Sequence, residues 1–427
     1  MRKARPLLIL LLLILILTGC GQSTVAPSAT LPPPTHTPAL PPPTATLTPV
    51  PAATGTPTLT PTLTPTSIPP VPLGWLAFQS FSDGHFQISV ARTDGRGART
   101  IVESVAYAEH PSWSPDGQWI ALDGATDWQS GEGAIYLAHA DGSSLALLVS
   151  QDGTFSKPSW SPDGGFIVYR LTSGTANGQD GFVDLFVVEV STGLTQRLTN
   201  TPGIYEHDPV YSPDGSRIAF AAADENAHFD LMVMDANGEN VTQLTHTSFN
   251  SAAPSWSPEG QRIAFISGDD FDTVSVINVD GSGFQELPNG PGYVRYLTWS
   301  PDGEWIVFTG SPPSLSGFHL YAVRADGSGL QELPILPNES ISNPTWSPLP
   351  ALQAGVTFVI TELGEGLNLR ASPALDGEVV EKLHEGDEIL AMEGPVEASQ
   401  YLWWRVRLGG SDLEGWVAEN PGWFSHP

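Results

Sequence analysis

The chain has 427 residues, of which 46 are acidic and 17 are lysine or arginine, so its formal net charge is −29. A body this acidic repels phosphate backbones, which excludes nucleic acid as an expected partner. Cys20 is the one cysteine in the sequence, so a disulfide within the chain and a cysteine-rich metal site are excluded as well.

Residues 1–20 have the pattern of a signal peptide. A short basic segment precedes the apolar run at residues 7–17, which is too short to span a membrane and has the length of a signal-peptide core. The next residues, Leu17-Thr18-Gly19-Cys20, resemble the lipobox of bacterial lipoproteins. The resemblance implies that Cys20 is diacylated and holds the protein on a membrane, whereas the alternative is an ordinary secretory signal with a chance cysteine.

Residues 21–72 form a linker with 16 prolines, 14 threonines and no charged residue. Proline removes backbone donors, and the segment has almost no large apolar side chain to bury, so no core can form. We expect a disordered, semi-rigid spacer that holds the following domain away from the membrane.

From residue 73 the sequence repeats with a period of 43–51 residues. An aromatic residue before Ser-Pro recurs six times, at Trp113, Trp160, Tyr211, Trp256, Trp299 and Trp346. The Ser-Pro-Asp-Gly segments that follow are turn sequences, so Asp116, Asp163, Asp214 and Asp302 are interpreted as turn residues rather than as catalytic or calcium-binding carboxylates.

Each repeat contains four short strand patterns, which predicts one blade of a β-propeller, and six repeats predict six blades over residues 73–350. The first repeat lacks the Trp-Ser-Pro strand, and the last copy (344–350) consists of little else. We therefore expect the strand at 344–347 to complete the blade that begins at residue 73 and to close the ring.

The repeated Pro-x-Trp-Ser-Pro-Asp-Gly segment and the apolar triplet after it resemble the WD-like propeller repeats of the periplasmic protein TolB. Related repeats occur in propellers of prolyl-oligopeptidase-type and tricorn-type proteases. The resemblance implies the fold but not the activity, because propellers carry many unrelated functions. The sequence contains neither a Gly-x-Ser-x-Gly nor a His-Glu-x-x-His motif.

Residues 354–427 depart from the repeat and resemble the bacterial Src-homology-3-like domain, a small β-barrel of envelope and cell-wall proteins. The matching residues include Leu367-Asn368-Leu369-Arg370, Trp403-Trp404 and Gly415-Trp416-Val417. Strand alternation assigns Trp404 to the core and predicts Trp403, Arg405 and Arg407 as a contact patch. The alternative is that the two arginines pair with neighbouring glutamates.

The residues just before each Trp-Ser-Pro strand should approach one mouth of the central channel. This set supplies the candidate binding residues Glu109, His110, Lys157, Glu206, His207, Asp208 and Asn343, with Ala253 and Leu297 at the remaining positions. The two Glu-His pairs would face one another across part of the channel, which makes His110 and His207 the weak metal candidates. A solvated polar mouth is the preferred interpretation, and no cofactor is expected.

The sequence thus predicts an all-β, extracytoplasmic, lipid-anchored and monomeric protein of the cell membrane or outer membrane. Its leading predicted function is non-catalytic binding of a protein or peptide by the propeller, with cell-wall or envelope contact by the C-terminal domain. A metal-dependent enzyme acting on carbohydrate or peptide and an extracytoplasmic ligand sensor are the two alternatives.

Overall fold

The structure is a computed structural model. It describes residues 71–425, except for 83, 126–132, 174–181, 224–227, 289, 291, 312–316, 337–338 and 400. The predicted signal peptide with Cys20 and the linker up to residue 70 lie outside the described residues. Within the described part, the one helical element is the 3-10 turn η1 (Glu362–Gly364), and no helix is long and apolar enough to cross a membrane.

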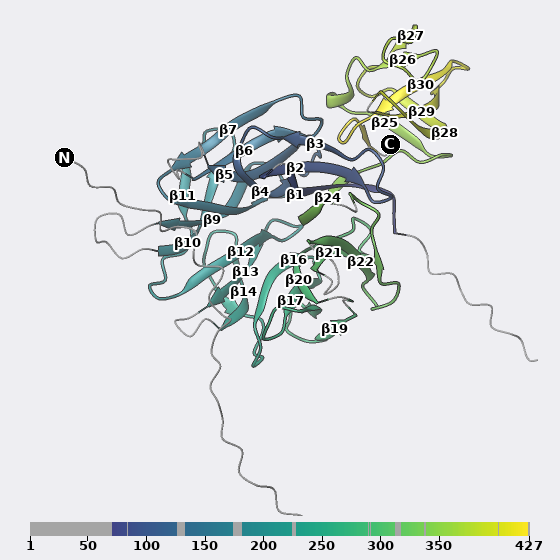
Figure 1. The fold of residues 1–427 in the computed structure, drawn as a ribbon. Coiled ribbons are helices and arrows are strands. Elements are labelled where there is room, and N and C mark those ends of the chain that lie inside the picture. Colours follow the sequence, from purple (N-terminus) through teal and green to yellow (C-terminus); the bar gives the residue numbers. More distant parts are fainter. Residues whose placement is uncertain are drawn as a thin grey trace, which may run out of the picture. The chain divides into compact units, whose positions relative to one another are not determined.

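The described strands before residue 351 form six four-stranded antiparallel sheets (Figure 1). One strand of each sheet contributes residues to a central cavity, and these inner strands are β4 (Ala106–Trp113), β8 (Thr154–Trp160), β12 (Tyr205–Tyr211), β16 (Ser251–Trp256), β20 (Tyr293–Trp299) and β24 (Ser340–Pro350). Successive inner strands are neighbours around the cavity, from β24 through β4 and on to β20. This arrangement confirms the predicted six-bladed propeller.

The other three strands of each sheet run outward from the cavity. The second strands are β1 (Gly74–Ser82), β5 (Trp119–Ala125), β9 (Phe166–Ser173), β13 (Arg217–Ala223), β17 (Arg262–Ser267) and β21 (Trp305–Ser311). The third strands are β2 (His85–Arg92), β6 (Gly133–His139), β10 (Phe182–Glu189), β14 (Phe229–Asp235), β18 (Thr273–Asn278) and β22 (His319–Arg324). The outermost strands are β3 (Arg99–Val102), β7 (Leu145–Gln151), β11 (Thr195–Arg197), β15 (Thr242–Gln243), β19 (Gln285–Leu287) and β23 (Gln331–Glu332).

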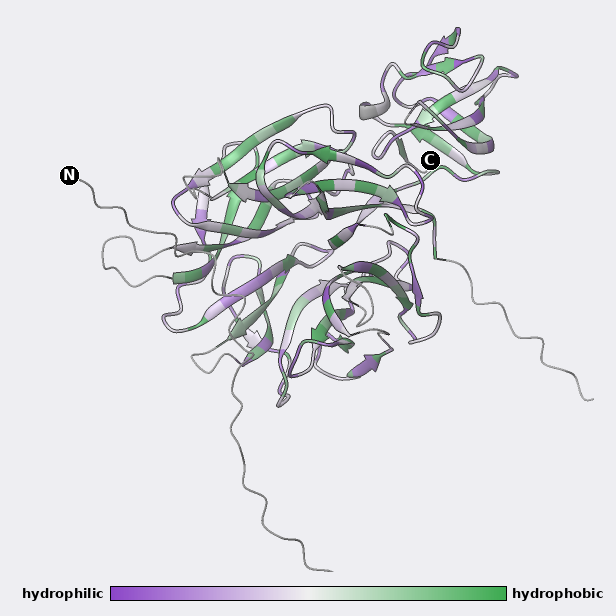
Figure 2. Ribbon diagram, viewed as in Figure 1, coloured by the Kyte–Doolittle hydropathy of each residue, from purple (hydrophilic) through white to green (hydrophobic). Residues whose placement is uncertain are grey.

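The second strands carry the apolar triplet of the repeat into the core. The isoleucines that begin five of the triplets are completely buried: Ile120, Ile167, Ile218, Ile263 and Ile306. Figure 2 shows hydrophobic stretches in strands of several blades, together with white and purple stretches in other parts of the strands. A blade buries these residues only by packing against its neighbours, which is why several repeats are needed for a stable core.

The ring is closed by a blade built from both ends of the propeller. Strand β24 pairs antiparallel with β1, and Leu76 lies opposite Trp346 in the register. The resulting sheet has the order β24-β1-β2-β3. The predicted closure by the last Trp-Ser-Pro strand is therefore confirmed.

In four blades the repeated tryptophan joins the blade to the preceding one. The indole Nε1 of Trp160 donates to the carbonyl oxygen of Ser112 at 3.2 Å, and Trp256 and Trp299 donate in the same way to the inner strand before their own. Across the closure, Trp113 Nε1 donates to the carbonyl oxygen of Thr345 at 3.2 Å. The recurrence of tryptophan in the sequence thus has a structural cause.

The aspartate of the repeated turn acts within its own turn. Ser114 Oγ donates to Asp116 Oδ1 at 2.5 Å, and the same oxygen accepts the amide N–H of Gln118 at 3.0 Å. Gly117 follows with a φ of 68°, a left-handed conformation that favours glycine. The same serine–aspartate bond recurs at Asp163, Asp214 and Asp302. The interpretation of these aspartates as turn residues is confirmed.

The C-terminal module, residues 357–425, is a seven-stranded antiparallel sheet. Its strands are β25 (Thr357–Ile360), β26 (Asn368–Arg370), β27 (Val379–Lys382), β28 (Glu388–Ala398), β29 (Tyr401–Leu408), β30 (Glu414–Glu419) and β31 (Phe424–Ser425), in the order β27-β26-β30-β29-β28-β25-β31. Phe358, Leu369, Trp404 and Val417 belong to one buried cluster. The Src-homology-3-like assignment of this module stays a prediction.

Candidate functional site

Six residues, one from each inner strand, form what we call the channel ring. Each lies three positions before the aromatic residue of its repeat and has a φ between 44° and 58°: His110, Lys157, Asp208, Ala253, Tyr296 and Asn343. The ladder with the second strand is interrupted here, and in five of the six strands the next residue is proline, which has no N–H to offer the ladder. The ring residues line a cavity of about 160 Å³.

Lys157 reaches from the third blade to two other blades of the ring. Its Nζ lies 3.3 Å from Asn343 Oδ1 in the first blade and 3.5 Å from the centre of the Tyr296 ring in the sixth. The pKa of Lys157 is lowered to about 8, chiefly because burial disfavours the ammonium form. A lysine whose ammonium form is less favoured than usual therefore lines the cavity.

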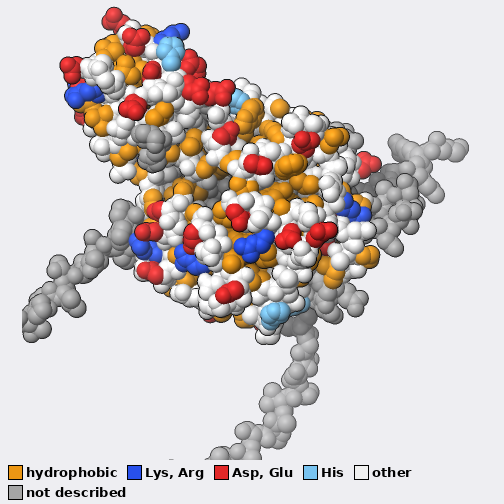
Figure 3. Space-filling model, turned by 180° about the vertical axis from the view of Figure 1, so that it is seen from behind, with side chains coloured by type: hydrophobic (Ala, Val, Ile, Leu, Met, Phe, Trp, Pro, Cys, Tyr) orange, Lys and Arg blue, Asp and Glu red, His pale blue; other side chains and the backbone are white. Residues whose placement is uncertain are grey.

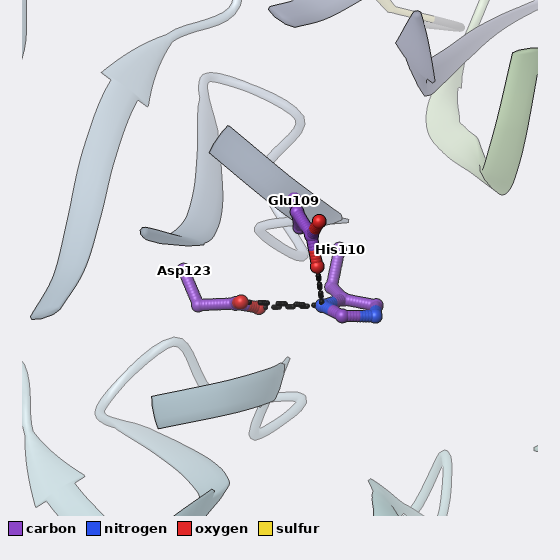
Figure 4. A group of neighbouring side chains, drawn as sticks. All are labelled: Glu109, His110 and Asp123. Atoms are coloured by element: carbon purple, nitrogen blue, oxygen red, sulfur yellow. Dashed lines mark hydrogen bonds and ion pairs between the residues drawn. The ribbon is translucent and has the colours of Figure 1, made fainter. Parts of the chain in front are cut away.

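A second polar group consists of the ring residue His110 and two carboxylates next to it, those of Glu109 and Asp123. Figure 4 shows both carboxylates directed at the same imidazole nitrogen. His110 Nδ1 lies 2.9 Å from Asp123 Oδ1 and 3.9 Å from Glu109 Oε2. Asp123 comes from β5, and its Oδ1 also accepts the amide N–H of Lys157 at 3.1 Å. The pKa of Glu109 is raised, mainly by burial.

Gln79 on β1 links the first and second blades at the same level. Its Oε1 accepts from Asn343 Nδ2 at 2.5 Å and from Ser342 Oγ at 3.1 Å. Its Nε2 donates to Glu109 Oε1 at 3.3 Å. The polar side chains of blades one to three thus form a connected network. The fifth blade contributes only the methyl group of Ala253 to the ring.

The second predicted Glu-His pair does not line the cavity. His207 Nδ1 lies 2.5 Å from Arg170 Nη1, and its ring packs against Phe229. Burial and then Arg170 lower the pKa of His207 to about 4. Glu206 is 2% exposed and accepts from Thr201 Oγ1 at 2.5 Å.

The two Glu-His pairs are out of register by one residue, which explains the difference. His110 directly precedes its proline, whereas Asp208 lies between His207 and Pro209. A shift of one residue along a strand turns a side chain to the other face. The predicted facing pairs are therefore absent, and Asp208 is the ring residue of the fourth blade.

Three residues of the site were not predicted from the sequence. The sixth ring residue is Tyr296 rather than the expected Leu297, and counting three positions back from Trp299 identifies it. Asp123 and Gln79 lie on second strands, directly after the apolar triplets at 120–122 and 76–78. The signal that could have found them is a polar residue at this position, which in the fourth and fifth blades is alanine and isoleucine.

The predicted contact patch of the C-terminal module is wrong in one residue. Trp403 is 1% exposed, and its Nε1 donates to the carbonyl oxygen of Ala398 at 2.9 Å. Alternation does turn Trp403 away from the core that contains Trp404, but other residues of the module cover that face too. Arg405 and Arg407 both pair with Glu414, at 2.9 Å and 2.7 Å, as the alternative interpretation expects.

Six four-stranded sheets around one central cavity define this protein as a six-bladed β-propeller. The model of the TolB beta propeller domain matches residues 75–350. The chain therefore belongs to the TolB β-propeller family.

Three solved structures are similar to this chain at low sequence identity, two of them with a TM-score above 0.5. TolB from Acinetobacter baumannii matches with a TM-score of 0.55 and 22% identity over 64% of this chain and 66% of that chain. Hydrazine synthase from Kuenenia stuttgartiensis matches with a TM-score of 0.54 and 13% identity over 70% of this chain and 50% of that chain. A putative TolB from Agrobacterium tumefaciens matches with a TM-score of 0.47 and 19% identity over 65% of this chain and 99% of that chain. At these identities the likeness concerns the fold alone.

Proposed function

We propose that this protein is a non-catalytic, extracytoplasmic envelope protein whose propeller binds a protein or peptide at the channel ring. Membership of the TolB β-propeller family and the polar ring around Lys157 support this function. Within the described residues, the Lys157 ammonium donates a single hydrogen bond, to Asn343, although it carries three N–H groups. Backbone carbonyls or a carboxylate of an entering peptide match the remaining donors.

The enzyme alternative is less well supported. In the form expected from the sequence, it requires His110 and His207 to share a metal with their neighbouring glutamates, yet His207 is held by Arg170 and lies outside the ring. A separate point concerns the binding partner. The surface of the protein is acidic, so the partner is not expected to be a polyanion. Figure 3 shows acidic side chains spread over the face of the protein opposite to that of Figure 1.

We further propose that Cys20 carries a lipid anchor, that residues 21–72 act as a spacer and that the C-terminal module contacts the cell wall or another envelope component. The lipobox-like segment and the uncharged proline-rich composition support the first two assignments. Metabolic labelling with a fatty-acid analogue followed by fractionation tests the anchor. Label and membrane association should both be lost in Cys20→Ser, and their retention would refute it.

The binding function is tested by photo-crosslinking in intact cells. A photoreactive amino acid at Ala253 lies in the ring, whereas one at Leu194, which is 70% exposed on the third blade, serves as the outer control. We expect one discrete protein adduct from Ala253 that is absent from Leu194. The adduct should weaken in Lys157→Met but not in Lys382→Met, a matched change at an exposed lysine of the C-terminal module. Equal adducts from both positions would place binding outside the channel.

A further inference from the structure

Three neighbouring side chains, of which His110 lines the cavity, have the composition of a cation site. One ligand atom from each of Glu109, His110 and Asp123 lies within 4.8 Å of the other two. Glu109 and His110 are consecutive on β4, and Asp123 faces them from β5 of the same blade (Figure 4). The left-handed conformation of His110, with a φ of 46°, lies at the interruption of the ladder where the ring residue meets the cavity.

The separations suit a small divalent metal ion. An ion with bonds of about 2.1 Å in tetrahedral geometry holds its ligand atoms about 3.4 Å apart. His110 Nδ1 is 2.9 Å and 3.2 Å from the two oxygens of Asp123, and 3.9 Å from Glu109 Oε2. These values lie on both sides of the tetrahedral separation, so small side-chain rotations would bring the three ligands around one ion.

The hydrogen-bonding capacity of His110 also favours a cation at this position. A single Nδ1–H bonds one carboxylate, yet two carboxylates face this nitrogen. The side chains of His110 and Asp123 are 10% and 6% exposed, so their surroundings screen the like charges of Asp123 and Glu109 poorly. A divalent cation neutralises both carboxylates at once.

Each carboxylate already has an outer partner that orients it. Asp123 Oδ1 accepts the amide N–H of Lys157, and Glu109 Oε1 accepts from Gln79 Nε2. Outer hydrogen bonds of this kind fix ligand orientation in metal sites. Glu109 Oε2 and Asp123 Oδ2 have no such donor among the described residues and are directed at the imidazole.

We propose that Glu109, His110 and Asp123 bind one transition-metal dication of the Zn²⁺ or Mn²⁺ class, with a further coordination position open to the cavity. One imidazole and two carboxylates suit these ions, whereas Ca²⁺ and Mg²⁺ prefer oxygen ligands alone. This set differs from the His110–His207 pair expected from the sequence, because Asp123 takes the place of the second histidine. The site goes beyond the proposed peptide binding and does not depend on it.

The experiment is a titration of the chelator-treated, full-length protein in mild detergent with ZnCl₂ and with MnCl₂, followed by calorimetry. We expect one ion per chain, and loss of binding in His110→Ala and in Asp123→Asn. His207→Ala, which changes a histidine outside the ring, is the matched control and should bind like the wild type. Binding that persists in His110→Ala, or no binding by the wild-type protein, would overturn the proposal.

Two further variants test the site in case His110→Ala or Asp123→Asn loses binding only because it misfolds. Glu109→Gln alters a side chain that is 32% exposed and should weaken the affinity while far-ultraviolet circular dichroism stays unchanged. Gln79→Ala removes an outer partner and should weaken the affinity about tenfold. Unchanged affinity in both well-folded variants would contradict the assignment. The crosslink from Ala253, repeated with and without chelator, reports peptide binding separately, so the two proposals fail independently.

Discussion

The guanidinium Nη1 of Arg92 lies 2.7 Å from Glu419 Oε2, a residue 327 positions further along the chain. Neither side chain is exposed to solvent. Glu419 also accepts from Trp404 Nε1 at 2.7 Å and from the amide of Leu352 at 2.8 Å. A strand end of the first blade and a strand end of the C-terminal module thus share one buried ion pair.

Removing the charge of Glu419 should strongly destabilise the protein. Glu419→Gln removes the buried counter-charge of Arg92 and leaves only the partly exposed Asp94, 3.6 Å from its Nε, so we expect the free energy of unfolding to fall by about 3–5 kcal/mol. Urea denaturation followed by tryptophan fluorescence measures the change. Glu414→Gln is the matched control, because Glu414 pairs with partly exposed arginines and should lose less than about 1 kcal/mol. Similar losses in both variants would show that the buried pair contributes no more to the free energy of unfolding than the exposed pairs of Glu414.

The closure of the ring should be as firm as an interior boundary between blades. Trp113 and Trp160 each donate an indole hydrogen bond of 3.2 Å to the preceding inner strand. Trp113→Phe and Trp160→Phe should therefore each lower the free energy of unfolding, by about 1–3 kcal/mol for the unsatisfied carbonyl and the lost packing. Thermal unfolding compares the two variants. A neutral Trp113→Phe beside a destabilising Trp160→Phe would mean that the closure opens without cost.

A methyl group at Gly74 should disturb the same closure. A Cβ there would lie 2.3 Å from Trp346 Nε1, and Trp346 belongs to a buried cluster that includes Leu76. Gly74→Ala should lower the free energy of unfolding by about 1–3 kcal/mol because the core is overpacked. In Gly165→Ala the nearest atom is Asp163 Oδ1 at 3.4 Å, so this control should stay within about 0.5 kcal/mol of the wild type. The prediction fails if the two variants melt alike.

Glu206 should make the protein less stable as the pH rises. Burial raises the pKa of Glu206 from its usual value of 4.5 to about 7, so the folded state holds the proton more tightly than the unfolded state does. The free energy of unfolding therefore falls between about pH 4.5 and pH 7, by at most about 3 kcal/mol, and the full loss is present above pH 7.

Glu206→Gln should accordingly be more stable than the wild type at pH 8 and no more stable at pH 4. Denaturation series at both pH values measure the difference, and Glu378→Gln on the exposed surface of the C-terminal module serves as the matched substitution for comparison. A Glu206→Gln variant that is destabilised at pH 8 would mean that the ionised carboxylate is stabilising.

The blades and their closure were predictable because they repeat. A tryptophan or tyrosine at a fixed offset recurs in each inner strand, so each copy supports the assignment of the others. The channel ring follows from the same periodicity once the offset is counted from the aromatic residue, as Tyr296 illustrates. Counting from the Glu-His dipeptide instead gave a wrong partner for His110, because side chains alternate and an error of one residue reverses the face.

The contacts that do not repeat were not predictable. Asp123 meets His110 through the pairing of β4 with β5, and its role rests on one polar residue in a buried strand. Trp403 was expected at the surface because alternation separates the faces of a strand without saying what covers each face. The pair of Arg92 and Glu419 joins segments that share no sequence pattern, so only the folded chain reveals it.

The blade shared by β1 and β24 also constrains the order of events during synthesis. Strand β1 ends at Ser82, and its partner begins only at Ser340. A nascent chain that has delivered five blades still presents β1 with one unpaired side, and this exposed backbone is open to other extended chains. A premature stop before residue 340 therefore yields an aggregation-prone arc rather than a smaller propeller, and the native ring forms only after the last inner strand has been translated.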